Sequence, residues 1–117
     1  MRGFAGMISG IMGPLNENPK FQHVYADASY RFLLVATDMP PAALIVIDDG
    51  KVTFEGVPLE DVKNTKRDGL IQCTLQQFMD LAQGKLNPVK AWVTRKIKLR
   101  GPRKLVKLLP VFGMLKF

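Results

Sequence analysis

The sequence has little of what most catalytic and metal sites need. Its 117 residues include one cysteine, Cys73, and one histidine, His23. A single cysteine cannot form an internal disulfide, so we expect a reducing, cytoplasmic setting. A metal site would have to combine this pair with distant carboxylates, and a cysteine at the end of an apolar strand is more often a small core residue than a nucleophile. We therefore predict a protein without catalysis, metal or cofactor.

Long apolar runs are also missing, and the N-terminal segment has a weak pattern. The longest apolar runs, residues 32–36 and 42–47, fall far short of the roughly 20 residues that a membrane-spanning helix needs. Residues 1–14 contain one arginine, an apolar run and four glycines, without the cleavage pattern of a signal peptide. Because each glycine disfavours a helix by about 1 kcal/mol, we expect a short, loosely ordered amphipathic segment: a surface helix, a membrane contact or a lid.

Acidic residues are absent from the last third of the chain. Residues 85–117 hold ten lysines and arginines and no aspartate or glutamate, whereas residues 1–62 hold four basic and eight acidic residues. Arg103 and Lys104 fall in the first turn of a predicted helix, where the helix dipole disfavours cations, so we expect an external anion to favour them. The predicted contacts to an anion are Lys96, Lys98, Arg100, Arg103, Lys104 and Lys107.

Three classes of anionic partner fit this charge, which sums to +7 over the chain. They are the headgroups of an anionic membrane, an acidic group of a ligand such as a coenzyme A phosphate, and nucleic acid. Nucleic acid ranks last, because Trp92 and Tyr30 do not interleave with the basic residues as a base-stacking platform would.

The first half of the chain has the pattern of strands. Apolar and polar residues alternate over 28–37, which predicts a strand buried mainly on one face, and a β-branched apolar run follows at 43–47. Asp49-Gly50 then favours a tight hairpin turn, so residues 51–56 should return antiparallel and complete a three-stranded meander. A fourth short strand is predicted at 70–73.

The second half has clear signals for helix ends. Thr74 and Gln77 have the spacing of a capping box, and Gly84 is placed to end the helix that follows. Asn87 and Pro88 begin a short helix that carries Trp92. Residues 93–100 then alternate as a fifth strand with a basic face, and a last helix begins at residue 102, where Pro110 should kink or end it. The prediction is one α+β domain, residues 1–117, with an antiparallel-rich sheet.

The order of these signals resembles a known family. Residues 78–92, with Gly-Lys-Leu-Asn-Pro at 84–88, and the basic stretch 95–101 that Gly101 closes resemble the C-terminal signature of the sterol carrier protein type-two family. The resemblance covers residues 74–109. It implies a five-stranded mixed sheet covered by helices, and an apolar tunnel between them that holds a fatty acyl chain, a phospholipid or a sterol. It also implies a carrier rather than an enzyme.

The predicted function follows from this resemblance and from the charge. We expect binding and transfer or presentation of a lipid (a fatty acyl chain, fatty acyl-CoA, phospholipid, or sterol or isoprenoid), with a basic rim that docks on anionic membrane. The alternatives are an accessory module that hands a lipophilic substrate to a partner enzyme, and a basic nucleic-acid-binding domain. Residues 102–117 are expected to act as a lid. Any single apolar residue could instead be ordinary core. The predicted tunnel residues are Phe32, Leu34, Phe54, Ile71, Phe78, Met79, Trp92, Ile97, Leu105, Leu108, Leu109 and Phe112.

Overall fold

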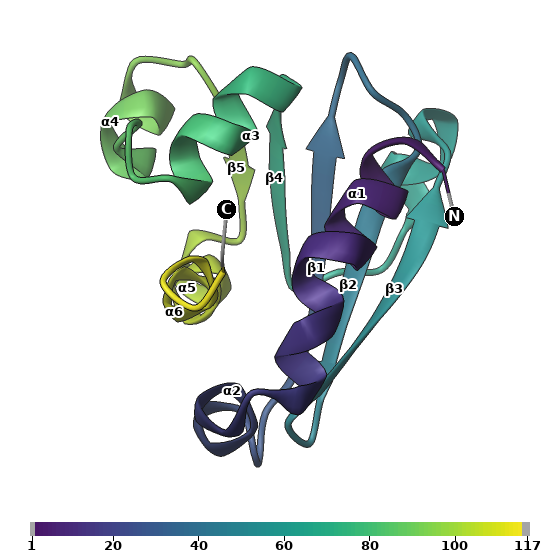
Figure 1. The fold of residues 1–117 in the computed structure, drawn as a ribbon. Coiled ribbons are helices and arrows are strands. Elements are labelled where there is room, and N and C mark those ends of the chain that lie inside the picture. Colours follow the sequence, from purple (N-terminus) through teal and green to yellow (C-terminus); the bar gives the residue numbers. More distant parts are fainter. Residues whose placement is uncertain (1, 116–117) are drawn as a thin grey trace.

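A five-stranded sheet with helices across one face makes up the framework of the protein. The computed structural model describes residues 2–115. The order of the strands across the sheet is β3 (Lys51–Val57), β2 (Ala42–Asp48), β1 (Ser29–Ala36), β4 (Gly69–Cys73) and β5 (Lys98–Arg100). β1, β2 and β3 are antiparallel, β4 runs parallel to β1, and β5 is antiparallel to β4. The predicted α+β fold with a mixed, antiparallel-rich sheet is therefore confirmed (Figure 1).

The hairpin between β2 and β3 follows directly from its two turn residues. Asp49 and Gly50 both have positive φ, at 49° and 78°, as a two-residue hairpin turn of this kind requires. The flanking residues Asp48 and Lys51 face each other in register. The turn predicted from Asp-Gly is therefore confirmed, and the register that it sets places Val52 on the helix-covered face.

The N-terminal segment differs from its expected loose order. It forms α1 (Gly3–Met12), a 3-10 helix (Gly13–Glu17) and α2 (Pro19–Val24), and α1 lies along β2 and β3 (Figure 1). Phe4, Ile8 and Met12 are completely buried beneath it. Burying each such side chain is worth about 1.5–3 kcal/mol, more than the roughly 1 kcal/mol by which one glycine disfavours a helix. The expected loose order was wrong because tertiary packing outweighed local propensity, and of the expected alternatives the segment forms a helix, which packs on the sheet.

The C-terminal half forms short helices joined by tight turns. They are α3 (Leu75–Ala82), α4 (Pro88–Val93), α5 (Pro102–Leu105), a 3-10 helix (Val106–Leu108) and α6 (Leu109–Phe112). The predicted capping box on α3 is present, with Thr74 and Gln77 each accepting from the other's backbone N–H. The Asn87 side chain likewise caps α4.

One C-terminal element is shorter than predicted, and another is interrupted where the sequence predicts. β5 begins at Lys98 rather than at residue 93, because α4 continues to Val93 and a turn follows it. The last helix is broken in the way that Pro110 predicts. Proline removes the hydrogen bond to the carbonyl four residues earlier, here Val106, and its ring crowds that group, so the helix changes to 3-10 geometry over Val106–Leu108.

Both faces of the central strands are buried. On the helix-covered face, Phe4 and Phe78 pack edge to face, with ring centroids 5.0 Å apart. On the opposite face, Leu33 and Val35 of β1 are also buried, in a second cluster that includes Val62 of the 3-10 helix Leu59–Asn64. The prediction that β1 is buried mainly on one face was therefore wrong, since the charged segment after β3 also contributes to the packing.

Candidate functional site

An apolar groove lies where the C-terminal helices meet the edge of the sheet. Its volume is about 430 Å³, and it runs between the end of α3, α4, β5 and the α5–α6 segment. We call it the apolar groove. It is lined by residues that include Ile71, Leu81, Leu86, Val89, Trp92, Ile97, Leu99, Leu105, Val106, Leu109 and Phe112. These side chains offer a surface suited to a hydrocarbon ligand.

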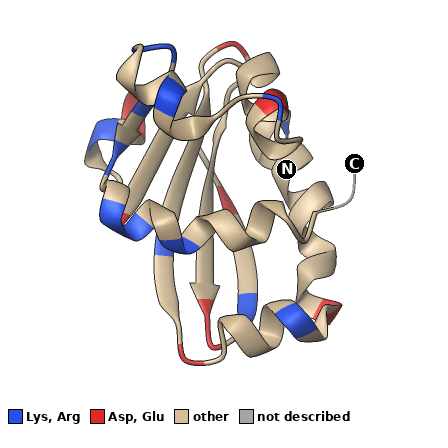
Figure 2. Ribbon diagram, turned by 90° about the vertical axis from the view of Figure 1, so that its left-hand side faces the viewer, with Lys and Arg blue, Asp and Glu red and all other residues tan. Residues whose placement is uncertain are grey.

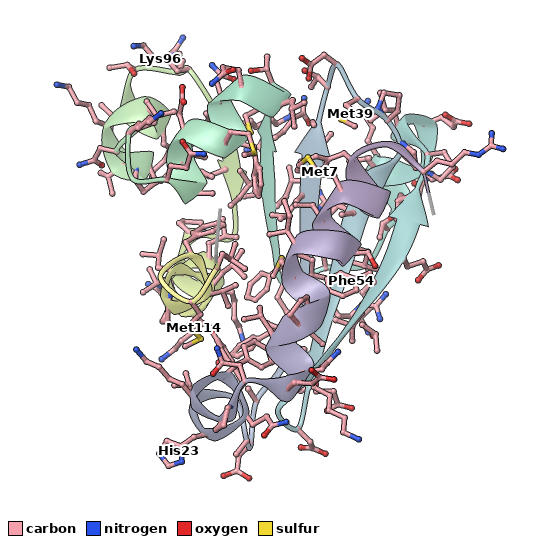
Figure 3. The ribbon with its side chains drawn as sticks, viewed as in Figure 1. Met7, His23, Met39, Phe54, Lys96 and Met114 are labelled. Atoms are coloured by element: carbon pink, nitrogen blue, oxygen red, sulfur yellow. The ribbon has the colours of Figure 1, made fainter. Side chains whose placement is uncertain are left out.

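Six of the predicted tunnel residues line this groove: Ile71, Trp92, Ile97, Leu105, Leu109 and Phe112. The other six lie elsewhere. Phe32, Leu34, Phe78 and Leu108 are fully buried in the packed core. Phe54 lies on β3 on the face that α1 covers, as Figure 3 shows, and Met79 is half-buried on α3. The apolar residues of the sheet centre therefore fill space, as the core interpretation had it.

The groove exists because two tight turns, at Gly84 before α4 and at Arg95 after it, fold α4 back beside β5. Gly84 ends α3 in a left-handed conformation, with φ of 76°, and the chain reverses there. The backbone N–H of Lys85 donates to the carbonyl of Asp80, which completes the turn at the end of the helix. Asn87 then begins α4 three residues later. The Gly-Lys-Leu-Asn-Pro sequence thus determines where one wall of the groove stands.

Large apolar side chains at the groove are left exposed. Val89 is 64% exposed, Val106 59%, Leu109 47% and Trp92 41%. Sequence reasoning included Trp92 and Leu109 but missed the two valines. Each valine precedes a predicted groove residue by three positions, which is the spacing of neighbours on one helix face, so this spacing was the available signal. Exposed apolar clusters of this kind mark binding surfaces.

A second, polar pocket of about 920 Å³ lies beside the groove at β5. We call it the polar pocket. It is lined by residues that include Gln72, Thr74, Gln77, Trp92, Arg95, Lys96, Ile97, Lys98, Leu99 and Arg100. Three of them, Trp92, Ile97 and Leu99, also line the apolar groove. The two spaces are therefore neighbours that share a wall.

The predicted cations divide into two groups. Lys96, Lys98 and Arg100 line the polar pocket. Arg103, Lys104 and Lys107 do not line it and lie exposed on α5 and the 3-10 helix after it. In Figure 2, the ribbon of the face that carries α4 and α5 has blue segments over both groups.

The contacts of the second group tie it to the start of the sheet. The Lys104 ammonium lies 5.8 Å from the centroid of the Tyr30 ring, within cation–π range. The Tyr25 hydroxyl donates to the backbone carbonyl of Lys107. Burial, with a smaller effect of Tyr30, raises the pKa of Tyr25 to about 12, so this hydroxyl keeps its proton as a donor at neutral pH.

The cysteine and the histidine lie in unlike surroundings. Cys73 is buried, and burial, with a smaller effect of the Asp38 charge, raises the pKa of its thiol to about 12. The thiol is therefore protonated and a poor nucleophile at neutral pH. His23 is exposed on α2 and points away from the body of the protein, as Figure 3 shows. Residues 2–115 contain no group of three or more His, Cys, Asp or Glu side chains that could hold a metal ion.

No helix within residues 2–115 has the length and hydropathy to cross a bilayer. The segment expected as a lid, residues 102–117, is partly core: Leu105, Leu108 and Val111 are buried. Its residues 116 and 117 lie outside the described part of the chain. An opening movement of this segment would therefore expose core residues as well as the groove.

Solved structures share this fold. The UbiJ-SCP2 ubiquinone synthesis protein matches with a TM-score of 0.68 and 12% identity, over 94% of this chain and 88% of that one. A sterol carrier protein 2 matches with a TM-score of 0.60 and 16% identity, over 90% and 92%. The inverting sec-alkylsulfatase Pisa1 from Pseudomonas sp. matches with a TM-score of 0.64 and 23% identity, over 82% of this chain, which spans 14% of the sulfatase.

At these identities the structural likeness shows the fold alone, and no curated protein matches the sequence. The family comparison goes further. The model of the SCP-2 sterol transfer family matches residues 21–110, which include the meander, the capped α3, the turn at Gly84 and the edge strand β5. The protein thus belongs to the SCP-2 sterol transfer family.

Proposed function

We propose that this protein binds a lipid in the apolar groove and transfers or presents it without catalysing a reaction. The observation that carries the proposal is the groove itself, with exposed apolar side chains on α4 and on the α5–α6 segment. Its volume lies within the range of about 300–1,000 Å³ typical of ligand pockets. Membership of a sterol transfer family supports the same class of ligand.

The energetics of an acyl chain suit reversible carriage. Each buried methylene is worth about 0.8 kcal/mol, so a dozen methylenes give roughly 10 kcal/mol before the costs of association. These costs are at least about 4 kcal/mol, which leaves at most about 6 kcal/mol, an affinity of tens of micromolar or weaker. A ligand held at this strength can still leave on demand.

Two exposed side chains give a matched test. Leu109 lines the groove and Val24 lies on α2 outside it, and both are 47% exposed. Leu109→Glu should weaken binding of a fluorescent fatty acid at least tenfold, because it places a charge against the hydrocarbon, whereas Val24→Glu should leave binding unchanged. Mass spectrometry of the native protein purified without detergent should show a bound lipid. No saturable binding, or equal loss in both variants, would contradict the proposal.

A second candidate is an accessory module that hands a lipophilic substrate to a partner enzyme. Two matches favour it: a ubiquinone synthesis protein, and a sulfatase in which this fold corresponds to a small part of a longer chain. An exposed groove beside a basic surface would suit delivery to a protein as well as to a membrane. Transfer of bound lipid between two vesicle populations by the protein alone distinguishes the carrier, because an accessory module needs its enzyme.

A further inference from the structure

We propose that the polar pocket binds the phosphate-bearing headgroup of the lipid whose hydrocarbon lies in the apolar groove. The ligand class is then a phosphate-containing amphiphile rather than a free fatty acid or a neutral sterol. This inference rests on the proposed function, since it assumes that the groove holds hydrocarbon.

The first support is the way in which one edge strand serves both spaces. In β5, Leu99 pairs with Ile71, and both side chains line the apolar groove. Lys98 and Arg100 alternate to the opposite face and line the polar pocket. Because β5 is the last strand of the sheet, a ligand can pass around its edge beside Trp92 with its tail on one face and its head on the other.

The second support is the chemistry of the polar pocket. Four cations line it, from Arg95 to Arg100, and its lining includes no aspartate or glutamate. The Gln77 amide also donates to the backbone carbonyl of Lys96 at 3.0 Å, which holds the turn between α4 and β5 against the first turn of α3. A carboxylate brings one charge and two oxygens, whereas a phosphate ester brings up to two charges and three oxygens. Several cations around a roomy pocket therefore match phosphate better.

The third support is the backbone of Arg95. Its φ is 62°, in the left-handed region, where glycine is the usual residue at a helix end. The turn is the same as the one at Gly84. Lys96 N–H donates to the Ala91 carbonyl at 2.8 Å, as Lys85 N–H does to Asp80 at the end of α3. Glycine would form this turn without strain, so folding alone gives no reason for an arginine here, and such outliers cluster at binding sites.

This backbone strain allows a test that distinguishes loss of folding from loss of ligand binding. Arg95→Gly removes a pocket cation while placing the favoured residue in the turn, so the melting temperature should stay or rise. A second variant, Lys98→Gln with Arg100→Gln, removes two further cations from exposed positions. Lys20→Gln is the matched control, because Lys20 is an exposed cation on α2 that lines neither the polar pocket nor the apolar groove.

The measurement is calorimetric titration with monomeric lysophosphatidic acid and with the monoacylglycerol of the same acyl chain. The natural protein and Lys20→Gln should bind the phosphate lipid at least about tenfold more tightly than the monoacylglycerol, as expected for charge-assisted hydrogen bonds. Arg95→Gly and the double variant should lose most of this preference and bind the monoacylglycerol as before. Glycerol 3-phosphate alone should bind far more weakly than the phosphate lipid.

The outcomes separate the two proposals. Equal affinity for the two lipids in the natural protein, or a preference that survives in the variant that combines all three substitutions, overturns the headgroup site while lipid binding stands. Tight binding of glycerol 3-phosphate alone would mean a site for free phosphate compounds and also overturns it. If neither lipid binds, the proposed function fails, and the headgroup inference fails with it.

Discussion

Single glycines in this protein have opposite roles that their positions determine. A Cβ on Gly10, in α1, would have no heavy atom within 4 Å. A Cβ on Gly101 would meet the carbonyl oxygen of Asp68, and this glycine also has a φ of 66°. The first glycine only loosens a helix, whereas the second lets the chain turn closely past the start of β4.

Alanine at these two positions should therefore change stability in opposite directions. Gly10→Ala should raise the free energy of unfolding by about 0.5–1 kcal/mol, the usual difference between the two residues in a helix. Gly101→Ala should lower it by about 2 kcal/mol or more, because backbone strain and a backbone clash add together. Urea denaturation of both variants at neutral pH checks this. A stabilised Gly101→Ala would contradict the described turn.

The buried thiol and phenol predict a loss of stability in alkali. The pKa of Cys73 is raised from 9.0 to about 12 and that of Tyr25 from 10.0 to about 12, so the unfolded chain releases both protons at lower pH than the folded one. Their contribution to the free energy of unfolding is complete below pH 9 and is lost as the pH rises toward 12. Urea titrations between pH 8 and 11 should show a smaller decline in Cys73→Ala than in the natural protein. An identical decline in both would contradict the burial described for the thiol.

At the scale of elements, the sequence allowed good prediction wherever a local signal decided the structure. Asp49-Gly50 determined a hairpin, and Thr74 with Gln77 determined the start of a helix, because each acts through hydrogen bonds and dihedral angles of its own segment. The order of α1 was not predicted, because the stability of this helix comes from Phe4 and Ile8, which pack on strands distant in the sequence. The turn at Arg95 was missed because no glycine announces it, and β5 was therefore predicted too long.

The same distinction explains how much of the site was predictable. Six of the twelve predicted tunnel residues line the apolar groove, and two of them, Trp92 and Ile97, lie between the turn-forming residues Gly84 and Gly101. Phe32 and Phe78 share their chemistry, yet the fold uses them to fill the centre. Composition cannot distinguish a residue that lines the groove from one that fills the core, since this depends on which helices cover the residue.

The groove elements should also open more readily than the meander. α4, β5, α5 and α6 have three to six residues each, whereas β1, β2 and β3 have seven or eight. Short elements with exposed apolar residues have little to hold them closed. Hydrogen exchange should therefore be fastest over 84–112 and slowest in β1 and β2, and a bound lipid should slow exchange over 84–112 in particular. Uniform exchange across both regions would contradict this division.

At the scale of the whole molecule, acidic and basic residues are unevenly distributed. The acidic residues are concentrated before residue 62, and the described cations of the last third lie on the face that carries α4 and α5 (Figure 2). A protein of net charge +7 with this asymmetry has an orientation in the field of an anionic surface. We therefore expect the protein to dock through the face that carries the apolar groove, so that the open side of the groove meets the membrane.

This docking is testable by charge reversal. Replacing Arg103, Lys104 and Lys107 by glutamate should weaken binding to anionic vesicles by at least about a hundredfold, because each lost cation costs about 1 kcal/mol and each added glutamate is repelled by the surface. The same triple change at Lys96, Lys98 and Arg100 should also weaken it. Reversal of Lys20, Lys51 and Lys63, which are exposed elsewhere, is the matched control. Cosedimentation at low and high salt measures the effect, and binding insensitive to salt would contradict the mechanism.

The shared wall between groove and pocket has an optical consequence. Trp92 is the sole tryptophan of the chain, it lines both spaces, and it is 41% exposed. Its emission therefore comes from one known point, in the wall between the apolar groove and the polar pocket. Acyl chains brominated at successive carbons would quench it most strongly at the carbon that lies beside the indole, while iodide in solution would quench it less as a ligand covers the ring. The fluorescence of Trp92 thus measures how deeply a bound lipid lies in the groove.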